Sequence, residues 1–147
     1  MENRTHTDEY WMRLALKEAE KGWGLCSPNP MVGAVVVKDG EKIGIGYHHR
    51  AGEEHAEVLA LREAGAAAYG ADLFVTLEPC CTWGRTPPCV EAILHAGIRR
   101  VVIGCLDQNP VHDGRGISIM LEAGVEVVSA VLEEDCLKLN EHFFWWI

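Results

Sequence analysis

The sequence predicts an α/β fold, a three-layer α/β/α sandwich around a five-stranded mixed sheet. Two patterns support this class. A β-branched run, an Asp-Gly pair and a second alternating segment follow one another over residues 31–47, which is typical of an antiparallel hairpin. From residue 73 onwards, short apolar runs alternate with segments of helical periodicity. That alternation indicates parallel strands joined by helical crossovers, with helices on both faces of the sheet.

The individual elements are marked by apolar periodicity and by residues that favour helix ends. Trp11 and Leu14 recur at helical spacing after Thr7, and the glycines at 97 and 124 favour helix termination. In chain order we expect a helix after Thr7 that stops at Lys21 and Gly22, strands over 31–37 and 42–47, a helix after His55 through Ala68, a strand over 73–76, a helix over 90–96, a strand over 101–103, a helix over 116–123, a strand over 125–128 and a helix from 133 to about 144.

Length and composition indicate one domain over residues 1–147. The chain is 48% hydrophobic and 24% charged, and a compact fold of this length buries roughly two-thirds of the surface that its unfolded chain exposes, so its core needs no disulfides. No apolar run approaches the roughly 20 residues of a membrane helix, and the first residues are polar. We therefore expect a cytoplasmic protein without a membrane partner. In that reducing compartment its six cysteines are thiols, metal ligands or buried fillers.

The charge balance argues against a nucleic-acid partner. The chain has 22 acidic and 13 basic side chains, for a formal net charge of −9, and its basic residues are scattered. Polyanions are normally met by clustered Lys and Arg. We therefore expect a small-molecule substrate, and a local basic pocket for one phosphate remains compatible with this composition.

Two segments place metal-ligand side chains near predicted helix starts. His55 precedes the second helix, and Cys80 and Cys89 bracket a loop that leads into the third. Unpaired N–H groups and the positive dipole end of a helix favour the thiolate, which is the form that binds zinc. One imidazole and two thiolates leave a fourth tetrahedral position open, as in catalytic zinc sites. Cys81 is an alternative ligand, but adjacent side chains diverge, so one of the pair must point away.

Glu57 is the expected proton carrier of such a site. It lies two residues after His55, on another side of the first helical turn, where it approaches a metal-bound water rather than the metal. In zinc-dependent base deaminases, zinc lowers the pKa of that water, and a glutamate moves its protons while hydroxide attacks the ring. Their usual signature has a second cysteine three positions after the first. Here Trp83 holds that position, and the next plausible ligand is Cys89.

A family resemblance rests on five segments. They are Ser27-Pro28-Asn29-Pro30-Met31-Val32-Gly33, His55-Ala56-Glu57-Val58, Thr76-Leu77-Glu78-Pro79-Cys80, Gly84-Arg85-Thr86-Pro87-Pro88-Cys89 and Gly114-Arg115-Gly116. Together they resemble the deaminase domain of the bifunctional riboflavin-biosynthesis deaminase-reductase, over nearly the whole chain. That family has the cytidine-deaminase-like fold, which agrees with the predicted sandwich.

The resemblance implies a zinc-dependent hydrolase that deaminates diaminohydroxyphosphoribosylaminopyrimidine, an early riboflavin intermediate. The products would be the corresponding pyrimidinedione and ammonia. By position, His55, Cys80 and Cys89 are similar to the family's zinc ligands. Glu57 is similar to its proton carrier.

The resemblance also implies substrate-binding residues, each with a plainer alternative. Asn29 matches a base-contacting asparagine, although Asn between two prolines also suits a turn. His48 matches a second pocket residue, although His48 and the adjacent His49 also suit a solvated strand end. Arg85 occupies the place of a basic residue that meets the substrate phosphate, and a solvated loop charge is the alternative.

Three departures from the family pattern bear on the substrate. The chain ends before the family's NADPH-dependent reductase domain, so we expect a separate protein to supply the reduction. Thr82 stands where the family has a histidine that helps hold the substrate, and Cys81 stands where it has serine. Gln108 replaces a proline. Because Thr82 and Cys81 belong to the loop expected to line the pocket, these changes concern substrate identity more than the metal chemistry.

Three alternative functions stay open at this point. A deaminase of another small amino-pyrimidine or pterin-like heterocycle would account for Thr82 and the absent reductase. A nucleic-acid deaminase needs a basic, aromatic-lined groove, which the net charge of −9 disfavours. A non-enzymatic zinc module needs a fourth protein ligand, for which Cys81 is the nearby residue.

Other residues receive weaker assignments. Glu78 lies beside the ligand loop, where it orients backbone or a ligand. The apolar ending over 143–147 docks on the subunit's own core or forms a subunit interface, which is compatible with a homo-oligomer. Core or surface thiols are expected at Cys26, Cys105 and Cys136, and ordinary surface residues at His6, His95, His112 and His142.

Overall fold

The computed structural model describes residues 6–26, 29–82, 87–107 and 114–141. These ranges contain a five-stranded sheet with the order β2-β1-β3-β4-β5. Strand β1 pairs antiparallel with both of its neighbours, whereas β3, β4 and β5 run parallel. The predicted mixed sheet is therefore confirmed. Its strands are β1 (Gly33–Lys38), β2 (Glu41–Tyr47), β3 (Asp72–Leu77), β4 (Arg100–Cys105) and β5 (Glu126–Val128).

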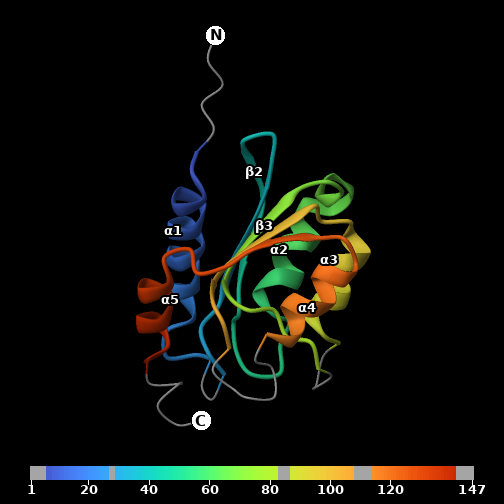
Figure 1. Cartoon of the computed structure of the whole chain (residues 1–147). Helices are drawn as coiled ribbons and strands as arrows, with labels where there is room; N and C mark the ends of the chain where they lie inside the picture. The colour runs from blue at the N-terminus through green and yellow to red at the C-terminus, as the bar shows by residue number, and fades with distance from the viewer. Residues whose placement is uncertain (1–5, 27–28, 83–86, 108–113, 142–147) are drawn as a thin grey trace.

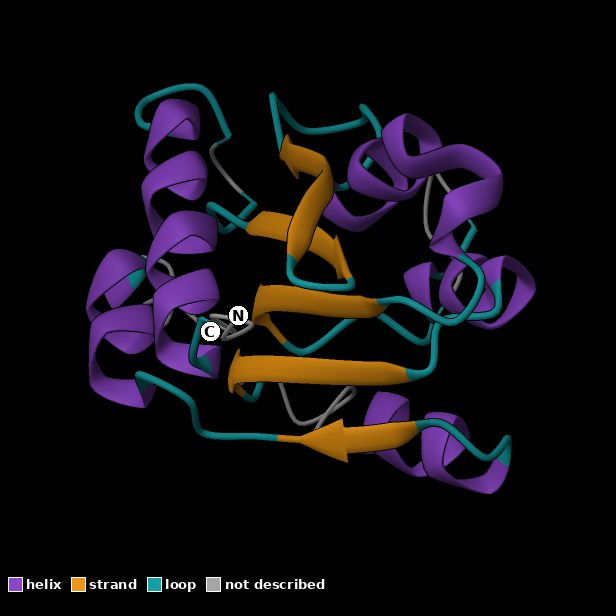
Figure 2. Cartoon of the chain, turned by 90° about the horizontal axis from the view of Figure 1, so that it is seen from above, coloured by secondary structure: helices purple, strands orange, loops and turns teal. Residues whose placement is uncertain are grey.

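Helices cover both faces of this sheet, which confirms the three-layer sandwich. Figures 1 and 2 show α1 and α5 on one face and α2, α3 and α4 on the other. None of the helices in the described ranges is both long and apolar enough to cross a lipid bilayer. The helices are α1 (Asp8–Ala19), α2 (Ala56–Ala64), α3 (Cys89–Ala96), α4 (Arg115–Glu122) and α5 (Glu133–Leu139), with short 3-10 turns η1 (Glu20–Gly22) and η2 (Gly65–Ala68).

The sheet is apolar on both faces because each face packs against helices. In β1, Ala34 and Val36 belong to the cluster beneath α2, α3 and α4, whereas Val35 and Val37 belong to the cluster beneath α1 and α5. Phe74 of β3 is buried in the second cluster. This two-sided burial explains the nearly continuous apolar runs of the strands.

The helix ends follow the local signals in the sequence. Thr7 caps α1 through a hydrogen bond of 3.2 Å from the Tyr10 N–H to the Thr7 hydroxyl. Gly97 ends α3 in the left-handed conformation, with φ 77°. The second helix is α-helical only to Ala64 and continues as the 3-10 turn η2. Helix α5 ends at Leu139, and the expected apolar segment 143–147 lies outside the described residues.

Two glycines of β2 bring α2 close to the sheet. A Cβ atom at Gly44 would collide with the Ala60 carbonyl of α2, and one at Gly46 would lie 2.8 Å from the Ala56 carbonyl. The absence of side chains at these positions lets the two backbones approach. The close approach fixes the first turn of α2, which carries the functional residues described next.

Candidate active site

Three potential metal ligands meet where two helices begin beside the end of β3. His55 is the N-cap residue of α2, and Cys89 is the first residue of α3. Cys80 lies in the loop after β3. The Val90 N–H donates to the Cys80 carbonyl at 3.2 Å, and the Cys89 N–H donates to Cys80 Sγ at 3.2 Å. These two bonds join the Cys80 loop to the first turn of α3.

The three donor atoms have the spacing of a metal site. His55 Nδ1 lies 3.0 Å from Cys89 Sγ and 3.6 Å from Cys80 Sγ. Together the three donor atoms lie within 4.8 Å of one another. Tetrahedral zinc with bonds of about 2.0–2.3 Å separates its ligands by about 3.3–3.8 Å. One imidazole and two thiols therefore fit zinc in both chemistry and spacing.

The surroundings of Cys80 favour its thiolate. Hydrogen bonding with Cys89 lowers the pKa of the Cys80 thiol to about 4, and His55 acts in the same direction. Hydrogen bonding with Cys80, together with burial, raises the pKa of Cys89 well above its ordinary value. Of the two thiols, Cys80 therefore gives the thiolate more readily, and the thiolate is the form that binds a metal ion.

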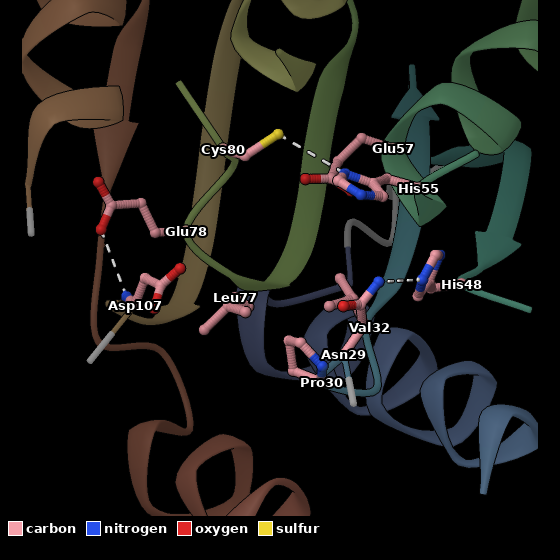
Figure 3. Close-up of a pocket in the computed structure, with 10 residues that line it drawn as sticks. All are labelled: Asn29, Pro30, Val32, His48, His55, Glu57, Leu77, Glu78, Cys80 and Asp107. Carbon is pink, nitrogen blue, oxygen red and sulfur yellow. Dashed lines mark hydrogen bonds between the residues drawn. The ribbon is translucent and has the colours of Figure 1, made fainter. Parts of the chain in front are cut away.

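Glu57 lies beside the ligand group on the first turn of α2. Its side chain is buried, with 3% of its surface exposed, and burial raises its pKa to about 7. Figure 3 shows Glu57 next to His55, with Cys80 close by. The predicted neighbourhood of His55, Glu57, Cys80 and Cys89 is therefore present in the structure. A carboxyl group with a pKa near neutrality is suited to both accepting and releasing a proton.

A cavity of about 210 Å³ opens beside this group. Residues from distant parts of the chain form its wall, and Figure 3 shows their arrangement. Two predicted substrate residues, Asn29 and His48, are among them and contact one another. The full lining consists of Asn29, Pro30, Val32, His48, His55, Glu57, Leu77, Glu78, Cys80 and Asp107.

The contacts of His48 fix its tautomer. Asn29 Nδ2, which can only donate, lies 3.1 Å from His48 Nε2, so that ring nitrogen accepts. His48 Nδ1 then carries the proton and donates to the Glu54 carbonyl at 3.2 Å. Burial lowers the pKa of His48, which keeps the ring neutral near pH 7. His48 is 2% exposed, so the alternative of a solvated strand end is wrong for this residue.

Two supporting contacts had no clear signal in the sequence. The Cys26 thiol donates to the His48 carbonyl at 2.8 Å, so this core cysteine holds the segment that carries His48. The Met31 N–H donates to Asn140 Oδ1 at 2.6 Å, and Asn140 Nδ2 donates to the Met31 carbonyl at 2.7 Å. Asn140 thereby fixes the backbone two residues after Asn29. Met31 and Asn140 are 109 residues apart in the sequence, so no local sequence pattern indicates their contact.

Other predicted residues are only partly placed by the structure. Thr82 is half-buried and is not among the described residues that line the cavity. Cys81 packs against the apolar cluster beneath α2, α3 and α4 and is not in the described ligand group. Arg85, Trp83, Gln108, His112 and His142 lie outside the described residues. Of the two alternatives for Cys26, Cys105 and Cys136, core or surface thiols, the structure shows the core. The expectation that His6 and His95 are surface residues is confirmed.

Comparison with known proteins decides the family. Residues 5–105 match the model of the cytidine and deoxycytidylate deaminase zinc-binding region, which is more than half of the chain. The chain belongs to this deaminase family. The matched range contains all three potential ligands and Glu57. The family's zinc-binding character and the His55, Cys80 and Cys89 group agree on Zn2+ as the metal.

The chain is also similar to riboflavin-biosynthesis members of this deaminase family. It is 54% identical to the riboflavin biosynthesis protein RibD of Aquifex aeolicus, over 95% of this chain and 39% of that protein. It is 52% identical to the chloroplastic riboflavin biosynthesis protein PYRD of Arabidopsis thaliana, over 92% of this chain and 32% of that protein. The chain thus spans about two-fifths or less of the length of these relatives.

Solved structures of the deaminase family agree with the fold. Acinetobacter baumannii RibD superimposes with a TM-score of 0.92 at 49% identity, over 93% of this chain and 38% of that one. A diaminohydroxyphosphoribosylaminopyrimidine deaminase/5-amino-6-(5-phosphoribosylamino)uracil reductase of Thermotoga maritima superimposes with a TM-score of 0.90 at 46% identity, over 95% of this chain and 41% of that one. The cytidine-deaminase-like fold predicted from the sequence is therefore confirmed.

Proposed function

We propose that this chain hydrolytically deaminates diaminohydroxyphosphoribosylaminopyrimidine in riboflavin biosynthesis. The observation that carries the proposal is the buried Glu57 beside the His55, Cys80 and Cys89 group, at one side of the cavity. Identities of 54% and 52% to riboflavin biosynthesis proteins, over more than nine-tenths of the chain, support this substrate class.

In the proposed mechanism His55, Cys80 and Cys89 hold a zinc ion. When bound, the ion would supply Lewis acidity to the attacking water. Glu57 accepts the proton of the attacking water and returns protons to a ring nitrogen and to the departing amino group. The ring carbon gains a bond to the water oxygen and loses its bond to nitrogen, so water and the amino-pyrimidine yield the pyrimidinedione and ammonia.

Asn29 and His48 are proposed to orient the pyrimidine ring. The Asn29 amide nitrogen donates to His48, so the Asn29 oxygen is the group suited to accept from a ring N–H. The structure fixes both side chains before substrate arrives, which reduces the ordering cost of binding. Thr82 is proposed as a further substrate contact, and Arg85 is proposed to meet the phosphate.

The proposal extends to the partners of the chain. The net charge of −9 supports a small phosphorylated heterocycle over a nucleic acid. We further propose that residues 1–147 act as one deaminase domain in the cytoplasm. A homo-oligomer is compatible with the apolar ending of the sequence.

A substrate panel tests the proposal. Zinc-loaded protein is offered diaminohydroxyphosphoribosylaminopyrimidine, its dephosphorylated form, cytidine and guanine, and ammonia release is measured. We expect fast release from the phosphorylated intermediate and a higher KM for the dephosphorylated form. Release from another heterocycle alone would retain the chemistry but reassign the substrate to the alternative suggested by Thr82 and Cys81.

A further inference from the structure

Glu78 is a buried carboxylate of the cavity that the proposed chemistry does not use. It follows β3 directly, and 3% of its surface is exposed. Figure 3 shows its carboxylate pointing away from Glu57 and Cys80 and towards Asp107. This orientation separates Glu78 from the proton transfers assigned to Glu57.

Three backbone N–H groups converge on the Glu78 carboxylate. Its Oε1 accepts from the Asp107 and Gly114 N–H groups, each at 3.3 Å, and its Oε2 accepts from the Gly116 N–H at 3.2 Å. Asp107 follows β4, whereas Gly114 is the N-cap residue of α4 and Gly116 lies in its first turn. The first N–H groups of a helix have no partner within the helix, so this negative side chain satisfies donors that would otherwise be unpaired.

The start of α4 also touches the turn that carries Cys80. A Cβ atom at Gly116 would lie 2.6 Å from the Pro79 carbonyl oxygen, which shows how closely the two backbones approach. Pro79 connects Glu78 to Cys80. In addition, the Glu78 N–H donates to the Cys105 carbonyl at the end of β4, at 2.9 Å. Glu78 therefore joins the ends of β3 and β4 to the beginning of α4.

We propose that Glu78 is a positioning residue of the substrate pocket. Its carboxylate clamps Asp107 and the first turn of α4 onto the Glu78-Pro79-Cys80 turn, and so fixes the wall of the cavity formed by Glu78 and Asp107. The effect on substrate binding rests on the proposed deaminase function. The clamp itself does not, because its hydrogen bonds are present without substrate.

Amide hydrogen exchange tests the clamp independently of activity. Glu78→Gln keeps the shape of the side chain but turns an N–H₂ group towards one set of backbone donors. In zinc-loaded protein we expect the amide of Gly116 or of Gly114 to exchange about tenfold faster or more. Asp72→Asn is the matched control, because Asp72 binds Arg99 and Arg100 at the other end of β3 and leaves both amides protected. Unchanged exchange in Glu78→Gln would overturn the clamp.

Steady-state kinetics test the effect of the Glu78 clamp on the substrate pocket. Gly116→Ala supplies a second variant, which leaves Glu78 intact. Both variants are expected to raise KM about tenfold while kcat stays within about threefold and the zinc content is unchanged. Gly124→Ala is the control, because it strains the other end of α4 at φ 89° without crowding a neighbour and leaves KM unchanged. Loss of zinc, or a lower kcat with unchanged KM, would overturn the positioning role.

A wild-type protein that deaminates nothing would refute the proposed function, and the exchange experiment alone would then test the clamp.

Discussion

At the scale of single residues, two buried glutamates of one cavity differ in their surroundings. Glu57 lies beside His55, and burial raises its pKa to about 7. Glu78 is buried as well, and burial raises its pKa, but three backbone N–H groups act in the opposite direction. A carboxylate that satisfies three donors is held in place, whereas one beside a ligand group is able to exchange protons. The different neighbours account for the different roles that we propose.

The contact between Asn29 and His48 gives a prediction at this scale. Asn29→Asp replaces a donor to His48 Nε2 with a carboxylate, which raises the pKa of His48 because the opposite charge favours the protonated ring. We expect both ring nitrogens of His48 to be protonated near neutral pH and KM to rise about tenfold or more. Nitrogen NMR of the ring and steady-state kinetics measure the two effects. A His48 pKa equal to that of the wild type would contradict the contact between Asn29 and His48.

At the scale of elements, α5 supports the pocket although it carries none of its lining residues. Asn140, at the C-terminal end of α5, satisfies both the N–H and the C=O of Met31. Met31 follows Asn29 and Pro30, which line the cavity. The end of one helix thereby fixes a loop that begins near the opposite end of the sequence.

Removal of the Asn140 side chain is expected to destabilise the protein. Asn140→Ala leaves two backbone groups of Met31 without their protein partner, and we expect the free energy of unfolding to fall by about 1–3 kcal/mol. Asn140→Asp keeps the acceptor for the Met31 N–H, so its free energy of unfolding is expected to lie between those of Asn140→Ala and wild type. Urea denaturation of zinc-loaded protein measures these changes, with Lys138→Ala on the exposed side of α5 as the control. Equal stabilities of Asn140→Ala and Lys138→Ala would contradict the assigned contact.

The elements themselves were largely predictable because their signals are local. Thr7 and Gly97 mark helix ends through capping geometry that depends on adjacent residues alone. Strands β3 and β4 each begin one residue before the apolar run that predicts them, because Asp72 and Arg100 pair in the sheet and bind each other at 3.2 Å. An ion pair between strands keeps polar residues within the sheet, and hydrophobicity alone does not reveal it.

The ligand group was predictable because its signals are also local. The contacts that hold the surrounding pocket in place were not predictable. His55, Cys80 and Cys89 belong to short motifs whose residue types already indicate metal binding. Glu78 was noticed beside the ligand loop, but its role depends on N–H groups 29 to 38 residues away. Asn140 depends on a contact across 109 residues. Partners that only the completed fold brings together leave no local pattern.

At the scale of the whole molecule, the proposed zinc ion joins separate parts of the fold. His55 begins α2, Cys89 begins α3 and Cys80 follows β3, so one ion would hold three elements together. A ligand that binds only the folded state stabilises it. The metal is therefore expected to contribute to stability as well as to chemistry.

Metal removal tests this expectation. At a free zinc concentration about 100 times the Kd, the folded state gains about 2.7 kcal/mol, so chelation should lower Tm by several degrees and added zinc should restore it. Cys80→Ser is expected to lose most of this response. Cys81→Ser is the matched control and should keep the response to zinc. Cys81 packs against the apolar cluster beneath α2, α3 and α4, and it does not belong to the described ligand group. An equal loss in both variants would contradict the assignment of ligands.

The most direct test of the central claim is the rate of ammonia release by zinc-loaded Glu57→Gln beside wild type, with the phosphorylated pyrimidine as substrate and zinc content measured in the same samples. The Gln side chain keeps the size of Glu57 but cannot carry protons. We predict full zinc occupancy in both proteins and a fall in kcat of at least about 100-fold in the variant. Full zinc occupancy with undiminished kcat would contradict the account, because proton transfer would then not depend on Glu57.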